Sequence, residues 1–335
     1  MSGPLLLAIE SSCDETGIAI VDGGRRIVAN VVASQVALHA PMGGIVPEVA
    51  ARAHVRWIVP VLEAAWTDAG VDWRDIDGVA VTYGPGLAGS LLVGINFAKA
   101  LAWSRGLPLV GVNHLEGHLH AAFLEDPDMA LPAVVLLVSG GHTMLVHVRA
   151  PGRYRLLGQT IDDAAGEAFD KVARFLDLGY PGGPAVEREA AGGDPRAVAF
   201  PRGLRHDGFD FSFSGLKTSV ITYVRKHPEA LTADVAASFQ EAVVDVLVEK
   251  TMRAAAAIDA RSVCIGGGVA ANGVLRARLV SAAQADGRAA FLPSRAMCTD
   301  NAAMVGATAW YRLRLDGPTP LNAAANPNLR LPLEG

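Results

Sequence analysis

The sequence predicts an α/β protein made of two similar halves, and three observations lead to this fold class. Short apolar runs alternate along the chain with longer segments of helical periodicity, which is typical of α/β layers rather than of a bundle or a sandwich. A unit of strand, small polar turn and strand occurs near the start of the chain and again near residue 133. The length of 335 residues fits two domains of ordinary size.

The first half begins with one copy of this unit and continues with alternating helices and strands. Strands are expected over residues 5–10, 18–21 and 26–33, with a polar turn over 11–17 and a hairpin at 22–24. Further along, apolar runs predict strands over 79–82 and 109–112, and helical periodicity predicts helices over 50–69 and 91–104.

The second half repeats the opening unit. Strands are expected over residues 133–138 and 144–148, around a polar turn at 139–143, and another strand over 262–265. Helices are expected over 164–176, 232–257, 273–285 and 302–315. Two homologous halves would bring two polar turns face to face across a cleft. Alternatively, the two units are ordinary hairpins that occur by chance and indicate no duplication. We place the domains at residues 1–128 and 129–335, with the last helix free to pack back on the first domain.

The composition predicts a folded protein and excludes several classes. Hydrophobic residues make up 51% of the chain, which is enough for complete cores and rules out disorder as the main state. No apolar run approaches the roughly 18 residues of a membrane span, and the N-terminus lacks the basic start of a signal peptide. Cys13, Cys264 and Cys298 are widely spaced, which argues against a disulfide framework and a cysteine zinc site. We therefore expect a cytoplasmic protein.

The net charge argues against bulk electrostatic binding of nucleic acid. Lys and Arg number 29 and Asp and Glu number 34, for a net charge of −5, whereas a protein that holds RNA by overall charge should be basic. Any RNA contact therefore needs a local basic patch or a partner protein. Candidate patches are Arg25 with Arg26, Arg52 with Arg56, and Arg202 with Arg205, although each is equally a set of solvated surface arginines.

The sharpest local motif is a histidine pair that follows the strand at 109–112. His114 and His118 are four residues apart, so on a helix they share one face and can bind one metal ion. Glu116 lies about 200° from His114 in helical projection, which makes it a poor general base and argues against a His-Glu-x-x-His protease. Asp300 is a candidate third ligand, although an aspartate at a helix start is equally an N-cap. His120 should point away from the pair.

Glycine-rich turns occur at residues 84–89, 179–183 and 266–268, and the first and third directly follow predicted strands. Each lets the backbone approach a phosphate, a ribose or a base, although glycine also marks plain turns. None of them matches the P-loop or dinucleotide-binding patterns. Together with the two polar turns they suggest a nucleotide in a cleft between the halves.

Taken together, these motifs resemble those of the tRNA adenosine threonylcarbamoyltransferase family. The resemblance covers nearly the whole chain and rests on collinear segments at residues 9–16, 113–118, 138–143, 162–171, 179–184, 211–218, 266–272 and 299–301. It implies a two-lobed fold of the actin, Hsp70 and sugar-kinase class, with duplicated ribonuclease H-like domains around a nucleotide cleft. This fold agrees with the repeated strand–turn–strand unit.

The resemblance also implies an activity and partners. Family members are acyltransferases that move the threonylcarbamoyl group of threonylcarbamoyl-AMP to N6 of the adenosine just 3′ of the anticodon (position 37) in tRNAs that read codons starting with A, and AMP leaves. The implied partners are tRNA, a paralogous subunit of the same fold and a P-loop ATPase. Two alternatives use the same cleft, namely an ATPase or phosphotransferase and a nucleotide-binding scaffold subunit. Glu10 stands where ATP-hydrolysing relatives usually carry an aspartate, which favours adenylate binding.

By the same resemblance, His114, His118 and Asp300 would hold one divalent metal ion, with iron (Fe²⁺) favoured and zinc as the alternative. The implied adenylate contacts are Leu137, Val138, Ser139, Gly140, Gly141, Asp170, Gly183, Glu187 and Asn272. Glu187 stands where many members carry an aspartate, and Leu137 where archaeal relatives carry a tyrosine, so that side chain cannot coordinate the metal. No dedicated general base is evident, so we expect catalysis by positioning and charge stabilisation.

Overall fold

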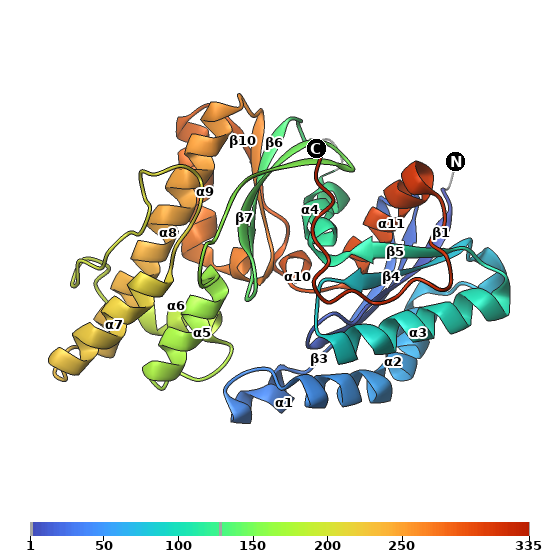
Figure 1. The fold of residues 1–335 in the computed structure, drawn as a ribbon, viewed down its shortest axis with the longest axis horizontal. Coiled ribbons are helices and arrows are strands. Elements are labelled where there is room, and N and C mark those ends of the chain that lie inside the picture. The colour runs from blue at the N-terminus through green and yellow to red at the C-terminus, as the bar shows by residue number, and fades with distance from the viewer. Residues whose placement is uncertain (1–2, 127–128, 335) are drawn as a thin grey trace. The chain divides into compact units, whose positions relative to one another are not determined.

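The computed structural model describes residues 3–126 and 129–334, and these residues form two compact units. The first unit contains the N-terminal residues up to 126 together with 299–333, and the second contains 129–298 together with 334. Each unit is built on one five-stranded sheet (Figure 1). Within the described residues, no helix is long and apolar enough to cross a membrane.

The sheet of the first unit has the strand order β3-β2-β1-β4-β5. Its strands are β1 (Leu5–Glu10), β2 (Glu15–Asp22), β3 (Arg26–Ser34), β4 (Gly78–Gly84) and β5 (Leu109–Asn113). β1 and β3 both pair antiparallel with β2, whereas β1, β4 and β5 run parallel to one another. The five strands confirm those predicted in this half. Because β1, β4 and β5 are parallel, their carboxyl ends meet at one edge of the sheet, where polar side chains gather.

Helices cover both faces of this sheet. Its long helices are α2 (Pro47–Ala69), α3 (Ala88–Arg105), α4 (His114–Glu125) and α11 (Ala302–Asp316), and α1 (Val36–His39) is a single turn. Leu7 and Ile9 point into a core with α2 and α3, while the alternate residue Ala8 faces α11. There α11 approaches so closely that a Cβ on Gly306 would lie 2.7 Å from the side chain of Val21. Small residues therefore set the close packing of α11 on the sheet (Figure 1).

The sheet of the second unit repeats this topology, with the order β10-β9-β6-β7-β8. Its strands are β6 (Ala133–Val138), β7 (Thr143–Ala150), β8 (Arg153–Gln159), β9 (Ser262–Gly266) and β10 (Ala289–Phe291). β6, β7 and β8 form an antiparallel meander, and β6, β9 and β10 are parallel. Strand for strand, this is the pattern of the first unit. The duplication predicted from the repeated strand–turn–strand unit is therefore confirmed.

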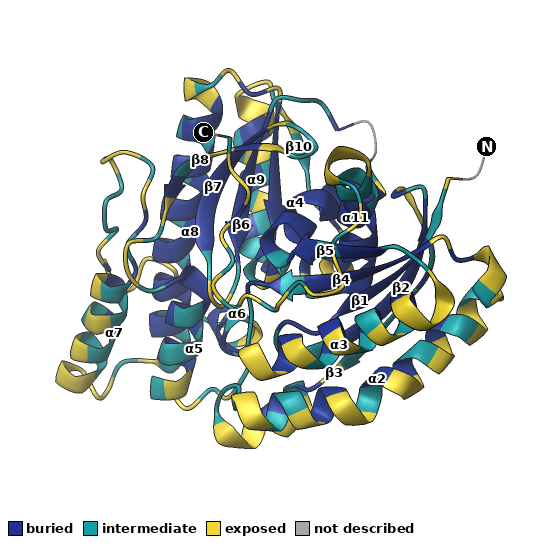
Figure 2. Cartoon of the chain, turned by 45° about the vertical axis from the view of Figure 1, so that its right-hand side comes forward, coloured by how far each residue is buried: buried dark blue, intermediate teal, exposed yellow. Residues whose placement is uncertain are grey.

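The core of the second unit lies between its sheet and its helices. These are α5 (Ala165–Phe175), α6 (Gly182–Ala190), α7 (Ser214–Lys226), α8 (Thr232–Ala257), α9 (Gly273–Ala285) and α10 (Arg295–Cys298). Val134 and Leu136 of β6 pack against α5 and α8, where the rings of Phe169 and Phe239 meet edge to face at 5.1 Å. The burial pattern in Figure 2 follows this arrangement, because the central strands β6, β7 and β9 and the inner helix faces are mostly buried, while the outer helix faces and the edge strands β8 and β10 are more exposed. The predicted helices near 164–176, 232–257, 273–285 and 302–315 are all present.

Candidate metal site and adenylate-binding turns

The helix that carries the histidine pair starts where β5 ends. Asn113 is the last residue of β5 and the N-cap of α4, because its Oδ1 accepts hydrogen bonds from the backbone N–H of Leu115 and Glu116 at 2.9 and 3.3 Å. Its Nδ2 donates to the carbonyl of Arg330 at 2.9 Å. The cap fixes the first turn of α4, so His114 and His118 lie one helical turn apart on the same face.

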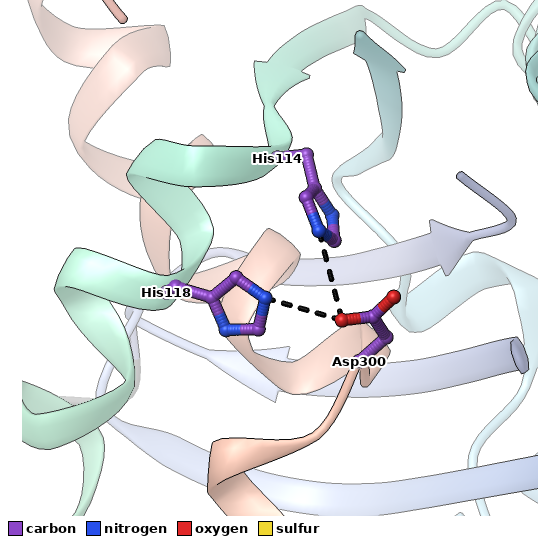
Figure 3. A group of neighbouring side chains, drawn as sticks. All are labelled: His114, His118 and Asp300. Atoms are coloured by element: carbon purple, nitrogen blue, oxygen red, sulfur yellow. Dashed lines mark hydrogen bonds and ion pairs between the residues drawn. The ribbon is translucent and has the colours of Figure 1, made fainter. Parts of the chain in front are cut away.

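The structure brings Asp300 to this histidine pair. Asp300 Oδ1 lies 3.1 Å from Nε2 of His118 and 3.6 Å from Nε2 of His114 (Figure 3). One donor atom from each of the three residues can be chosen so that all lie within 4.8 Å of one another. The N-cap of α11 is the neighbouring Asn301, whose Oδ1 accepts from Met304 N at 3.1 Å. The carboxylate of Asp300 is therefore left for the histidines rather than for the helix start.

The three residues fit a divalent metal ion. Two imidazole nitrogens and one carboxylate oxygen form a donor set that leaves coordination positions open, and this set suits both non-haem iron and catalytic zinc. Burial acts to lower the pKa of His114, but the carboxylates of Asp300 and Glu10 raise it to about 9. Burial likewise acts to raise the pKa of Asp300, but the two histidines lower it to about 2. The carboxylate thus stays ionised and favours positive charge beside it, so His114, His118 and Asp300 form a possible metal-binding triad.

Glu10 is a site residue whose role here the sequence interpretation missed. It ends β1, is completely buried, and places Oε2 3.1 Å from Nδ1 of His114. Thr82 Oγ1 donates to the same oxygen at 2.6 Å. A carboxylate on the far nitrogen of a ligand histidine fixes its tautomer and orientation. The signal that could have revealed this role is a polar residue at the end of a buried strand that is parallel to β4 and β5.

Glu116 lies away from the metal triad, as its spacing from His114 predicts. It is 1% exposed, and both carboxylate oxygens accept from Arg312 Nε, at 3.0 and 2.9 Å. Because Arg312 belongs to α11, this ion pair joins the two helices that flank the triad. His120 is a core residue that packs edge to face on Tyr311, and burial followed by the charge of Arg312 lowers its pKa to about 3. Neither residue is placed to act as a base for a metal-bound water.

In the second unit, the turn between β6 and β7 presents backbone rather than side chains. Leu137 and Val138 are completely buried, main chain included, and pair with Met144 and Thr143 of β7. Ser139 N donates to the carbonyl of His142 at 2.8 Å, which closes the turn. A Cβ on Gly140 or Gly141 would meet no atom within 4 Å, so both glycines border open space.

The remaining adenylate candidates lie on elements that are linked to this turn or to one another. Gly166 N of α5 donates to the Ser139 carbonyl at 3.2 Å, and a Cβ on Gly267 would lie 2.5 Å from the Val138 carbonyl oxygen. Two carboxylates accept hydrogen bonds from helix starts: Asp170 Oδ1 from Gly182 N, and Glu187 Oε1 from Gly273 N, both at 2.8 Å. Asn272 Nδ2 donates a hydrogen bond to Gln240 Oε1, also at 2.8 Å. A Cβ on Gly183 would meet no atom within 4 Å. Asp170 and Glu187 therefore hold the N-termini of α6 and α9, while Gln240 orients Asn272.

The three arginine clusters proposed from the sequence are partly neutralised. The paired arginines and their distances are Arg26 with Asp22 at 2.7 Å, Arg52 with Glu48 at 2.8 Å, Arg202 with Asp245 at 2.8 Å, and Arg205 with Glu249 at 2.5 Å. Each cluster thus has at least one arginine whose charge is offset by a neighbouring carboxylate. These clusters are weak candidates for a phosphate-binding patch.

Solved structures with a similar fold support the fold assignment. Component A of the (R)-2-hydroxyglutaryl-CoA dehydratase of Acidaminococcus fermentans aligns with a TM-score of 0.57 at 16% identity, over 93% of this chain and 100% of that chain. HypF of T. kodakarensis aligns with a TM-score of 0.64 at 15% identity, over 94% of this chain and 48% of that chain. The duplicated sheet and these likenesses confirm the actin-like α/β fold that the sequence predicts.

Sequence comparison places the chain more narrowly. The family model described as TsaD, tRNA N6-adenosine threonylcarbamoyltransferase, matches residues 26–307. Proteins with that name are 55% identical in Moorella thermoacetica, over 97% of each chain, and 52% identical in Symbiobacterium thermophilum, over 100% of this chain and 99% of the other. A third protein with that name, from Geobacter sp. strain M21, is 56% identical over 93% of this chain and 92% of the other. The chain therefore belongs to the tRNA N6-adenosine threonylcarbamoyltransferase family, as its motifs predict.

Proposed function

We propose that this protein transfers the threonylcarbamoyl group from threonylcarbamoyl-AMP to N6 of the adenosine just 3′ of the anticodon in tRNA. Membership of the family supports this reaction, and the observation that carries it is the convergence of His114, His118 and Asp300. In the reaction a bond forms between N6 and the carbamoyl carbon, the bond from that carbon to the phosphate oxygen breaks, AMP leaves, and the amine loses a proton. An ATPase, a phosphotransferase or a nucleotide-binding scaffold is not favoured by the family assignment.

The metal triad would hold one divalent ion, which we propose to be iron, with zinc as the alternative. When bound, such an ion polarises a carbonyl oxygen and orients the substrate through its open positions. The buried carboxylate of Glu10 would hold Nδ1 of His114, so that Nε2 faces the ion beside Asp300. The residues of the chain thus supply a rigid set of donors rather than a proton acceptor.

The turns of the second unit would bind the adenylate. The turn at residues 137–141, where Gly140 and Gly141 border open space, would contact the adenylate together with the N-termini of α6 and α9, which are suited to a phosphate. The hydrogen bonds of Asp170 and Glu187 to those helix starts would keep Gly183 and Asn272 in place. Because AMP is already a good leaving group, most of the barrier is met by holding amine and carbonyl in a reactive geometry.

The cellular setting is part of the same proposal. We propose that the protein works in the cytoplasm with a paralogous subunit of the same fold and a P-loop ATPase. The two duplicated units would be the two lobes of the enzyme, the first carrying the metal ligands and the second the adenylate contacts. A net charge of −5 makes tight binding of tRNA by the chain alone unexpected and agrees with a need for partners.

The reaction is tested by mass spectrometry of tRNA nucleosides. Wild-type protein, its partner subunits and tRNA are incubated with threonine, bicarbonate, ATP and the synthase that makes the adenylate. The proposal predicts threonylcarbamoyl-adenosine and one AMP per transfer, with loss of product in His118→Ala. His206→Ala, which removes an exposed histidine paired with Glu249 at 3.3 Å, serves as the control and should retain activity. Steady release of phosphate from ATP without modified adenosine would instead support an ATPase.

A further inference from the structure

The hairpin of β7 and β8 carries three arginines close together on the second unit. Arg153 and Arg155 are two residues apart on β8, so their side chains share one face, and Arg155 pairs with His147 across the ladder. Arg149 sits at an irregularity between Val148 and Ala150, where it has no partner on β8. All three arginines are exposed. We define these three residues as the arginine face of the hairpin.

Little negative charge opposes the arginine face. Arg149 forms an ion pair with Glu334 at 3.4 Å. For Arg153 and Arg155, no carboxylate of the described residues lies within ion-pair distance. In each of the three two-arginine clusters considered earlier, by contrast, a neighbouring carboxylate offsets at least one arginine, so at most one charge of each pair stays unopposed. The hairpin therefore concentrates positive charge that the protein leaves available.

His147 lies among these charges and is largely buried. It is 6% exposed, and neither ring nitrogen finds a hydrogen-bond partner among the described residues. Burial, followed by the charges of Arg149 and Arg155, lowers the pKa of His147. Arg155 lies opposite His147 in the ladder and Arg149 is two residues further along β7, so the unpaired nitrogens of His147 leave hydrogen-bonding capacity beside the arginines.

The hairpin is also held rigidly. Tyr154, between Arg153 and Arg155, is completely buried, and its hydroxyl accepts from Gly152 N in the turn at 2.9 Å. Its carbonyl accepts from the backbone N–H of Glu334 at 2.8 Å. The buried ring anchors β8, while Arg153 and Arg155 on either side of it are exposed. A rigid scaffold lowers the entropic cost when arginines engage a ligand.

We infer that the arginine face binds the phosphate backbone of the tRNA substrate. This inference rests on the proposed function, which requires RNA to be held by a protein whose net charge is −5. Arginine is suited to phosphate because its planar group donates two parallel hydrogen bonds. β7 begins at Thr143, beside the turn proposed to bind adenylate, and Arg155 pairs four residues further along it, about 14 Å away at the usual strand rise. The face would anchor tRNA near that turn without contacting the reacting atoms.

The inference is tested by the salt dependence of tRNA binding. Fluorescence anisotropy with a full-length tRNA transcript is measured between 50 and 200 mM salt, for wild type and for Arg153→Gln/Arg155→Gln. Loss of two phosphate contacts should lower the slope of log K against log salt by about 1.8 and weaken binding roughly 10- to 60-fold near 0.1 M salt. The control is Arg52→Gln/Arg74→Gln, which removes two exposed arginines that already have acidic neighbours and should keep the wild-type slope.

Further measurements separate this inference from the proposed function. Arg153→Lys/Arg155→Lys keeps both charges and should keep the slope, which identifies charge rather than misfolding as the cause. In the transfer assay, Arg153→Gln/Arg155→Gln should raise KM for tRNA with little change in kcat. Suppose that wild type modifies tRNA while the Gln variant keeps the wild-type salt slope of tRNA binding and the wild-type KM. The arginine face then does not bind tRNA. The same result is expected if the face binds an acidic protein instead. If wild type makes no modified adenosine under any condition, the proposed function itself fails.

Discussion

Breaking the ion pair between α4 and α11 should destabilise the first unit and weaken its metal site. Glu116 is 1% exposed, and the side chain of Arg312 is 16% exposed, with its Nη2 2.8 Å from the carboxylate. Removing one partner of a buried pair costs about 3–5 kcal/mol, because the other charge stays desolvated. Asp316, which is 3.1 Å from Arg312 and mostly exposed, offers a second partner. We therefore expect about 3 kcal/mol for Glu116→Leu, which corresponds to a melting point lowered by about 6–12 °C.

The double variant makes this reasoning refutable. Glu116→Leu/Arg312→Leu leaves no buried unpaired charge, so most of the lost stability should return. Metal affinity should follow the same order, since α4 carries His114 and His118 while Asp300 directly precedes α11. Both are measured by thermal melting and by competition with a coloured chelator. As a control, Glu48→Leu breaks an exposed pair with Arg52 and should cost no more than about 1 kcal/mol. Additive losses in the double variant would show that the two side chains do not act as a pair.

Three further perturbations test other parts of the account. Glu10→Gln should weaken metal binding about 10- to 100-fold in a chelator titration while the fold survives, because His114 loses the carboxylate that orients it. An unchanged metal affinity would show that Glu10 does not support the site. Gly267→Ala should weaken AMP binding about tenfold or more by calorimetry, because Gly267 has φ +88° and its Cβ would meet the Val138 carbonyl, whereas Gly268→Ala, which meets nothing within 4 Å, should bind normally. Native His120 stays neutral down to a pKa of about 3, while the unfolded chain takes up a proton below about pH 6.5, so stability should fall as pH drops through that range. His120→Phe should reduce the steepness of this loss by about one proton in denaturant titrations, and an unchanged steepness would contradict the buried neutral histidine.

The fold was largely predictable because its strands are signalled locally. Runs such as residues 5–10 and 133–138 are apolar on both faces, as strands buried between helices must be, and the repeated polar turn identified the duplication. The position of the last helix, by contrast, could not be predicted. Residues 302–315 are predicted to be helical, but no local pattern indicates that α11 packs on the sheet of the first unit, where Gly306 permits its close approach.

The metal site was predictable only in part. The spacing of His114 and His118 determines that they share a face, and the same rule correctly turned Glu116 away. The partner of the pair could not follow from spacing, since Asp300 is 182 residues from His118 and reaches it only through the packing of α11. Local reasoning also left Asp300 open as a helix cap, a role that Asn301 performs. Glu10 was missed for the same reason, because its contact with His114 depends on the order of strands in the sheet.

Metal content measured by elemental analysis after exhaustive dialysis tests the central claim most directly. Wild type reconstituted with Fe²⁺ under anaerobic conditions should retain one ion per chain, and Asp300→Ala should retain almost none while keeping the wild-type circular dichroism spectrum. A full equivalent of iron in Asp300→Ala would mean that this carboxylate is not a ligand, and the site proposed here would be wrong.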